Sequence, residues 1–298
     1  RHRSGAVAIS CCFHYLCQGL VYRFTFKLAF QHTIIIGMVQ NKFYRKNEVQ
    51  MTQDTICEDT HCQTVESFVT RVTAELDALH SEEKRVVLPR FFKCGAGEYG
   101  EGDRFLGVVV PDTRAVARKN MFASLEEVEG LLESQWHEVR LCGLLILVGQ
   151  CRKSVPKDVF EFYLAHTERI NNWDLVDLTA PAIVGGYLLG RPQERERIYS
   201  LADSESLWEK RIAVVSTFTF IRNREYDDTY ALAIKLMRHP HDLMHKAIGW
   251  MLREAGKRDQ PRLESFLDEY ATSMPRTMLR YSIEKFPEEL RRHYLQLR

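Results

Sequence analysis

Apolar residues recur at intervals of three and four along most of the chain, which is the period of an amphipathic α-helix. The first such stripe follows Thr64 and consists of Val65, Phe68, Val69, Val72 and Leu76. A Gly-rich loop from Gly95 to Gly107 interrupts the pattern, and Pro111 then stands where the first turn of a helix is expected. The nearest approach to a strand pattern is the short run Val108 to Val110. The pattern therefore predicts an all-α protein.

Beyond the loop, the chain divides into pairs of helices separated by short breaks. The breaks carry residues that start or stop helices, among them Ser124, Pro156, Pro192 and Pro240. The predicted pairs are 124–133 with 136–151, 156–169 with 172–189, 192–201 with 206–221, 226–238 with 242–256, and 260–272 with 275–284.

The second helices of successive pairs resemble one another. Their basic residues Arg140, Arg211 and Lys246 lie 71 and then 35 positions apart, and Asn172-Trp173-Asp174 occupies the intervening slot. Two-helix units of about this length are typical of HEAT-like repeats, in which each unit buries its apolar face against its neighbours. We therefore predict a HEAT-like α-solenoid of stacked helix pairs, with the starts of the second helices lining a concave face that binds a ligand.

Composition limits the possible functions. The chain has 41 Lys and Arg against 40 Asp and Glu, so a nucleic-acid surface would have to arise from segregated charge, not from excess. None of the eight Cys forms the C-x-x-C spacing of a zinc or redox site, which favours a reduced, cytoplasmic protein. His239, His241 and His245 have no carboxylate or Cys pair to complete a ligand set, so we predict neither a metal nor a cofactor.

The first fifty residues differ from the rest. Residues 1–50 show no clear period and are predicted to be a poorly ordered upstream extension or a cloning remnant. Ala6 to Val21 is apolar enough for a signal-peptide core, but polar residues interrupt it and no small-residue cleavage site follows, so we predict no membrane association. Met51 is the natural start in this interpretation, with 51–63 as a polar linker and 64–298 as the helical domain.

Four residues are predicted to meet on the concave side. Trp173 and Asp177 are four positions apart and share a helix face. Arg211 lies near the start of the second helix of the next pair, and Trp250 lies on the second helix of the pair after that. Taken one at a time, a Trp on an apolar helix is usually part of the core, an Asp near a helix start is usually a cap, and an Arg there is usually solvated. Their recurrence at the repeat period favours a common site.

Three segments carry a family resemblance. They are Asn172-Trp-Asp-Leu-Val-Asp177, Leu207-Trp-Glu-Lys-Arg211 and Lys246-Ala-Ile-Gly-Trp-Met-Leu-Arg-Glu254, and they closely resemble the AlkD-type DNA alkylation repair glycosylases. The resemblance covers Val65 to the C-terminus. It implies a HEAT-like solenoid that wraps duplex DNA and hydrolyses the N-glycosidic bond of 3-alkyladenine and 7-alkylguanine without an enclosing base pocket.

The resemblance also implies roles for the four residues. Asp177 would be the catalytic carboxylate, Trp173 and Trp250 would flank the deoxyribose of the lesion, and Arg211 would contact the backbone there. One carboxylate suits this chemistry, because an alkylated purine is already cationic and needs no general acid, whereas glycoside hydrolases usually need a second carboxylate. No Lys stands beside Asp177 to form a Schiff base, so we predict a monofunctional hydrolase.

DNA binding requires cations that face the phosphates. The candidates are Arg140, Lys246, Arg253 and Lys257, whereas Arg152 and Lys153 are interpreted as ordinary solvated charges. We predict a monomer acting on duplex DNA that contains alkylated purines. Two alternatives stay open at this stage: a protein-binding α-solenoid scaffold, and a DNA-binding relative without activity, which would gain nothing from a carboxylate facing phosphates.

Overall fold

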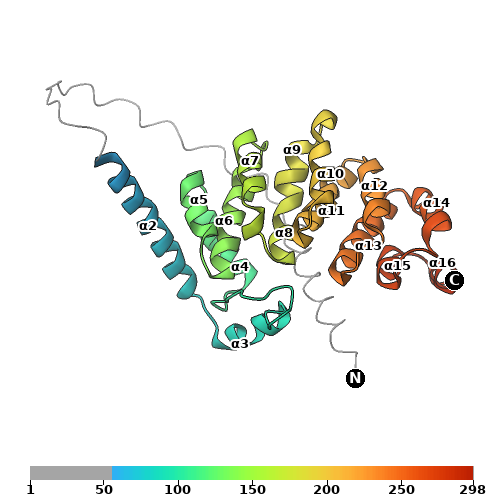
Figure 1. Ribbon diagram of the computed structural model, residues 1–298, viewed down its shortest axis with the longest axis horizontal. Coiled ribbons are helices and arrows are strands. Elements are labelled where there is room, and N and C mark those ends of the chain that lie inside the picture. The colour runs from blue at the N-terminus through green and yellow to red at the C-terminus, as the bar shows by residue number, and fades with distance from the viewer. Residues whose placement is uncertain (1–55, 298) are drawn as a thin grey trace, which may run out of the picture. The chain divides into compact units, whose positions relative to one another are not determined.

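The computed structural model describes residues 56–297, which fall in one compact unit extending from Gln53 to Arg298. The predictions made for residues 1–50 and for Met51 lie outside the described residues. Throughout 56–297 the regular structure is helical, with one isolated bridge between Arg104 and Trp136 in place of any strand (Figure 1). The all-α prediction is confirmed.

Three helices precede the repeated pairs: α2 (Ile56–Asp77), α3 (Glu82–Phe91) and α4 (Val110–Lys119). The pairs are α5 (Leu125–Leu132) with α6 (His137–Gln150), α7 (Lys157–Ala165) with α8 (Trp173–Ala180), α10 (Glu196–Asp203) with α11 (Leu207–Arg222), α12 (Asp227–Leu236) with α13 (Asp242–Gly256), and α14 (Gln260–Tyr270) with α15 (Arg276–Ser282). A last helix, α16 (Glu288–Gln296), follows them and was not predicted. Helix α2 begins inside the segment predicted as a linker, and the division into domains stays a prediction.

Side-chain caps fix where three of the second helices begin. The side chain of Asn172 accepts a hydrogen bond from the backbone N–H of Trp173, at 2.9 Å, at the start of α8. Ser206 caps α11 in the same way, and the ring of His241 caps α13. Caps of this kind each stabilise a helix by ~0.5–2 kcal/mol. The starts of these helices, where the candidate residues stand, are therefore set by local sequence.

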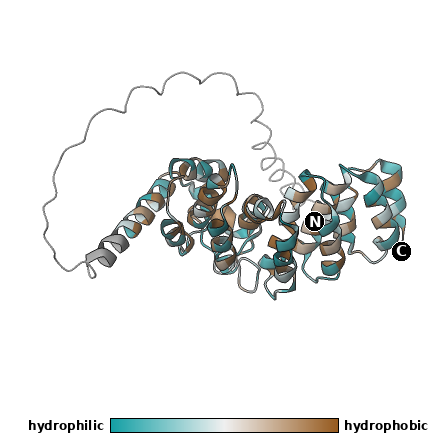
Figure 2. Ribbon diagram, turned by 90° about the horizontal axis from the view of Figure 1, so that it is seen from above, coloured by the Kyte–Doolittle hydropathy of each residue, from teal (hydrophilic) through white to brown (hydrophobic). Residues whose placement is uncertain are grey.

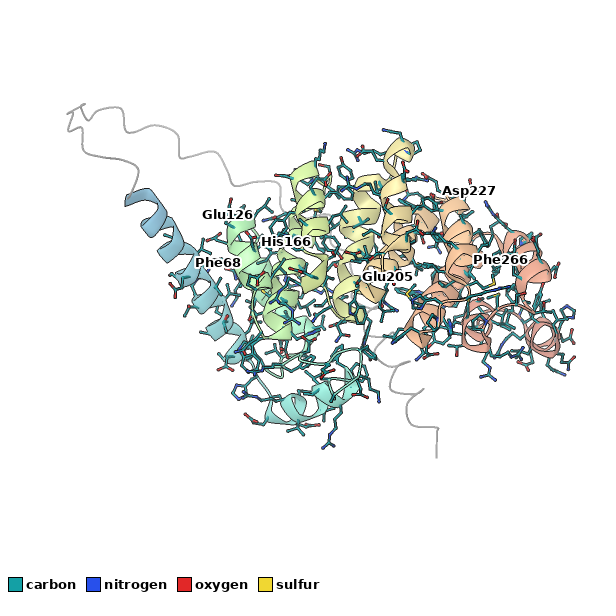
Figure 3. The ribbon with its side chains drawn as sticks, viewed as in Figure 1. Phe68, Glu126, His166, Glu205, Asp227 and Phe266 are labelled. Atoms are coloured by element: carbon teal, nitrogen blue, oxygen red, sulfur yellow. The ribbon has the colours of Figure 1, made fainter. Side chains whose placement is uncertain are left out.

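The second helices form the buried layer of the unit. Helices α6, α8, α11, α13 and α15 contact one another in succession, and a continuous hydrophobic core runs between them and the first helices. Every residue of α6 from His137 to Leu147 is buried. Figure 3 shows Glu205, which precedes α11, near the lower end of that helix, whereas Asp227 at the start of α12 lies at the upper side. The first and second helices therefore start at opposite edges of the layer.

The second helices approach each other closely at two glycines. A Cβ on Gly249 of α13 would come within 2.6 Å of the Met278 carbonyl oxygen of α15. Helix α8 continues through a π-helical turn, η2 (Pro181–Gly185), into α9 (Gly186–Leu188), and a Cβ on Gly185 would collide with the Ser216 carbonyl of α11. Pro181 lacks a backbone N–H, which explains why the regular α-helical ladder changes there.

The C-terminal end of the stack is more polar than its middle. The hydropathy colouring in Figure 2 is predominantly hydrophilic next to the C-terminus, and Tyr294 is the one buried residue of α16. A polar outer face at the last repeat is what a helical array needs at its end. Along the described part of the chain, none of the helices has the length and hydrophobicity needed to cross a membrane.

Candidate active site

Polar contacts join the starts of five successive second helices. We call this row of contacts the polar seam. It consists of His137 with Asp174, Asp177 with Arg211, Arg211 with the carbonyl oxygen of Leu243, and Asp242 with Thr277. Since each pair bridges neighbouring second helices, the repeat brings polar residues to one edge of the layer, as the sequence predicted for Asp177 and Arg211.

Asp177 and Arg211 form the centre of the seam. The Nε and Nη2 atoms of Arg211 donate to the two carboxylate oxygens of Asp177 at 2.9 and 2.8 Å. The Nη1 atom of the same guanidinium donates to the Leu243 carbonyl oxygen at 2.7 Å. The Arg211 and Asp177 side chains are only 4% and 3% exposed. The pair is thus bidentate, which is the strongest geometry for a carboxylate and a guanidinium.

Two opposing effects set the protonation of Asp177. Burial raises the pKa of its carboxyl group, because a charged carboxylate loses its hydration. The charge and hydrogen bonds of Arg211 lower that pKa, while the negative charge of Asp174 adds to the rise. The net direction is upward. Arg211 is therefore the group that allows a carboxylate to exist in this buried position.

Aromatic rings surround the first turn of α8. Trp173 stacks on Phe92 with ring centroids 5.3 Å apart and packs edge-on against Phe91 at 5.8 Å. Trp173 is partly buried and stands one turn before Asp177 on α8. The two residues share a helix face, as their spacing predicted. Aromatic faces of this kind favour a nearby positive charge.

The Gly-rich loop, Gly95 to Gly107, lies against the same edge (Figure 1). Its Tyr99 packs edge-on against Trp208 of α11 and against His241, each at 5.9 Å between centroids. The indole N–H of Trp173 donates to the Tyr99 hydroxyl, although burial still raises the pKa of Tyr99 to about 12. Tyr99 therefore contacts residues at the starts of α8, α11 and α13, around the Asp177–Arg211 pair.

Three helix α6 residues hold this loop in place. The Glu138 carboxylate accepts hydrogen bonds from the backbone N–H groups of Leu106, Gly107 and Val108, at 2.9 to 3.1 Å. His137 and Arg140 both bind Asp103 of the loop. Gly107 has a φ of 94°, and a Cβ there would meet the Ser81 carbonyl oxygen at 2.5 Å. Only glycine fits this point of the loop.

Trp250 lies farther along its helix than the other three residues. Its ring packs against Phe218 of α11 at 5.7 Å between centroids, and Phe218 is seven residues beyond Arg211. Seven residues of helix correspond to ~10 Å. Trp250 thus stands about two turns from the Asp177–Arg211 pair, and its predicted place beside the deoxyribose stays a prediction.

The four predicted DNA-binding cations differ in accessibility. Lys246 pairs with Asp242 at 2.7 Å and Lys257 with Glu254 at 2.6 Å, and their side chains are 27% and 37% exposed. Arg253 pairs with Glu284 and is 13% exposed. Arg140 is 4% exposed and bound to Asp103. The phosphate contacts predicted for these residues stay predictions, and the structure gives Arg140 a second role as an anchor of the loop.

The sequence interpretation missed Tyr99, Asp103 and His137, and it named Asp174 only as part of the segment Asn172-Trp173-Asp174. Tyr99 and Asp103 belong to the irregular loop, whose partners lie far away in the sequence. His137 was detectable, because it stands at the start of its second helix, 35 residues, about one repeat period, before Asn172 at the start of the next one. His239, His241 and His245 hydrogen-bond to backbone groups around the start of α13.

The fold and this site define a class of protein: an all-helical stack of repeats with a buried carboxylate, a guanidinium and aromatic rings at the starts of its second helices. A model of the DNA alkylation repair enzyme family matches residues 72–286. The chain belongs to this family, and the resemblance seen in its sequence is confirmed.

The comparison of structures supports the fold. A "Predicted DNA alkylation repair enzyme from Enterococcus faecalis" is similar, with a TM-score of 0.59 and 17% sequence identity. The match covers 70% of this chain and 97% of that one. No curated protein matches the sequence.

Proposed function

We propose that this protein is a monofunctional DNA glycosylase that removes cationic alkylated purines, such as 3-alkyladenine and 7-alkylguanine, from duplex DNA. The observation that carries the proposal is the bidentate Asp177–Arg211 pair, one turn from Trp173 and its cluster of aromatic rings. Membership of the DNA alkylation repair enzyme family supports alkylated DNA as the substrate.

The reaction needs only one carboxylate. The C1′–N bond breaks and its electron pair goes to the alkylated purine, which leaves as a neutral base. Asp177 stabilises the oxocarbenium that develops on the sugar and orients a water molecule toward C1′. The water oxygen bonds to C1′, and its proton passes through Asp177 to solvent. Each Asp177 oxygen retains a lone pair for this task, because a carboxylate can accept about four hydrogen bonds and Arg211 uses two.

Substrate binding requires a small opening of the site. The Asp177 side chain is 3% exposed, so a sugar or water cannot reach it freely. Tyr99 is the group placed to move, by rotation of its side chain, because it contacts the residues around the pair while the loop that carries it stays bound to α6. Lys246 and Lys257 are the predicted phosphate contacts with the most exposed side chains, and Arg140 and Arg253 would have to leave acidic partners.

The direct test incubates the chain with duplex DNA containing 7-methylguanine and measures the released base. We expect release by the wild-type protein and, from the magnitude of electrostatic stabilisation in other enzymes, a loss of about 100-fold or more in Asp177→Asn. Asp227→Asn is the matched control, because Asp227 is an exposed carboxylate at the start of a first helix.

Each other outcome identifies an alternative. Tight binding of DNA with no released base would leave a DNA-binding protein without activity. Neither binding nor release would favour a protein-binding scaffold. Release by Asp177→Asn at the wild-type rate would refute the role assigned to Asp177 while keeping the glycosylase.

A further inference from the structure

A buried network of charged groups joins the Gly-rich loop to the starts of α6 and α8. His137 lies between two carboxylates: its Nδ1 is 2.9 Å from Asp103 Oδ2, and its Nε2 is 2.9 Å from Asp174 Oδ2. Arg140 binds the other oxygen of Asp103. The side chains of these residues are between 2% and 5% exposed. With an acceptor on each nitrogen, the ring is an imidazolium that donates on both sides.

The two carboxylates belong to the two elements that flank the Asp177–Arg211 pair. Asp103 is in the loop that carries Tyr99, and Asp174 follows Trp173 directly on α8. Asn172, the cap of α8, also reaches Asp103, at 3.4 Å. His137 therefore connects the loop to the first turn of the helix that bears Trp173 and Asp177.

A column of rings makes a second connection. The His137 ring stacks on Phe105 at 4.6 Å and lies 5.0 Å from Phe92, and Phe92 stacks on Trp173 at 5.3 Å. A displacement of the imidazole would leave a gap beside Phe92. Because close-packed side chains move to fill such a gap, Phe92 would shift, and the ring of Trp173 that stacks on Phe92 would shift with Phe92.

We propose that His137 is a positioning residue: it holds Tyr99 and Trp173 in register with Asp177 by clamping Asp103 of the loop to Asp174 of α8. A network that served only packing would be replaceable by apolar side chains of similar volume, often without loss of stability. The polar arrangement has a geometric result that packing alone does not supply, since it fixes the angle and distance between two separate elements. The inference has a positional part, that His137 sets the positions of Tyr99 and Trp173, and a kinetic part, that this positioning speeds excision. Only the kinetic part rests on the proposed glycosylase function.

The positional part is tested by ¹⁹F NMR on the full chain labelled with 5-fluorotryptophan. The four Trp signals are assigned by single Trp→Phe variants. In His137→Gln, which retains an amide near Nε2, and in His137→Asn, which retains one near Nδ1, we expect the Trp173 signal to shift or broaden. The Trp250 signal, two turns from the pair, should not change. His166→Gln is the control, because each ring nitrogen of His166 also has an acceptor, the Phe162 carbonyl oxygen and the Glu129 carboxylate, away from the site.

The kinetic part is tested by a double-mutant cycle on the single-turnover excision rate. His137→Gln should slow excision by about 10- to 100-fold through misplacement, with little change in the KM for DNA. Tyr99→Phe should slow it as well. If His137 acts through the position of the loop, the double variant loses less than the product of the two single effects.

The results separate the two claims. An unchanged Trp173 signal in folded His137→Gln, or effects that multiply in full, would overturn the positioning role. If the wild-type protein releases no base, the glycosylase proposal fails, and the ¹⁹F spectra still decide the positional claim. If His137→Gln does not fold, Asp103→Asn replaces that variant in both measurements. Asp103→Asn removes one side of the clamp without a change in side-chain shape.

Discussion

Arg211 holds Asp177 with two parallel hydrogen bonds, and a lysine cannot reproduce that geometry. Arg211→Lys should therefore lower the single-turnover rate of base release by about 10- to 100-fold, the equivalent of ~1.5–3 kcal/mol for the removal of a hydrogen bond between charged groups. Arg197→Lys is the matched control, because Arg197 makes a bidentate pair with Glu161 that is largely exposed. Equal rates in wild type and Arg211→Lys would show that the bidentate contact has no part in the reaction.

The pKa of Asp177 predicts an acid limit for activity. The ionised carboxylate is the active form, so activity falls when pH drops through the pKa of this group in the folded protein. Burial raises that pKa above the ordinary carboxylate value of about 3.9. The profile of kcat/KM against pH, which reports on the free enzyme, should therefore decline at a higher pH than an ordinary carboxylate would give. A rate that stays constant down to pH 4 contradicts this expectation.

His137 predicts a decline of stability in the alkaline range. Burial disfavours the imidazolium, but Asp174 and Asp103 outweigh it and raise the pKa of His137 to about 9. Asp103 of the loop and Asp174 of α8 face this ring, and Arg140 of α6 lies beyond Asp103. Since the pKa is higher in the folded state, the stabilisation is complete below pH 6.5 and is lost as pH rises through about 9.

The size of this effect can be measured by urea unfolding at a series of pH values. A shift from 6.5 to about 9 corresponds to ~3 kcal/mol of free energy of unfolding. The wild-type protein should lose about that amount between pH 6.5 and 9.5, and His137→Gln should show a flatter profile from a lower starting stability. Parallel profiles for the two proteins would mean that His137 is not the titrating group.

At the scale of single residues, the sequence predicted only part of the site. Asp177 and Arg211 were predicted because each stands in a recognisable slot of a repeat, and their contact follows from the stacking of those slots. Tyr99 and Asp103 were not predicted, because their positions depend on contacts across large sequence separations: Asp103 meets His137 34 residues away and Asn172 69 residues away. No local pattern records such contacts.

Among the elements, the helix pairs were predictable and the loop was not. Each pair has its own caps and breaks, so its ends depend on nearby residues such as Ser124, Asn172 and Ser206. The Gly-rich loop is ordered by a carboxylate of α6, Glu138, which binds three successive N–H groups of the loop. Helix α2 starts at Ile56, although residues 51–63 are too polar to have predicted it.

The close approach of α11 to the π-helical turn after α8 gives a prediction for that element. Gly185→Ala would place a methyl group against the Ser216 carbonyl and within 2.9 Å of Thr219 Cβ, both on α11. We expect it to reduce the free energy of unfolding by ~1–3 kcal/mol, as overpacking generally does. Gly149→Ala is the matched control, because its Cβ would meet only the flexible Met121 side chain. Equal stability of the two variants in urea would show that the helices can separate at no cost.

For the whole molecule, DNA binding depends on how charge is distributed, because the net charge is only +1. Lys246→Ala and Lys257→Ala should each weaken the binding of duplex DNA and reduce the salt dependence of log Kd by ~0.9 for each phosphate that the variant no longer neutralises. Lys235→Ala is the control: Lys235 also pairs with an Asp, Asp203, but lies on the first helix α12. Fluorescence anisotropy over a range of salt concentrations measures both quantities. An unchanged slope in all three variants would place the DNA elsewhere on the molecule.

The polar seam has a consequence for how such a chain can evolve. In most helical arrays one repeat can be inserted or deleted, because every interface is formed by similar apolar faces. Here the second helices carry different complementary groups, so deletion of the pair α10 and α11 would leave Asp177 facing α13 without the guanidinium of Arg211. An uncompensated buried charge costs ~3–5 kcal/mol, a large part of the stability of a domain. We therefore expect related chains to keep the number and order of the central repeats and to vary in length at the ends of the array.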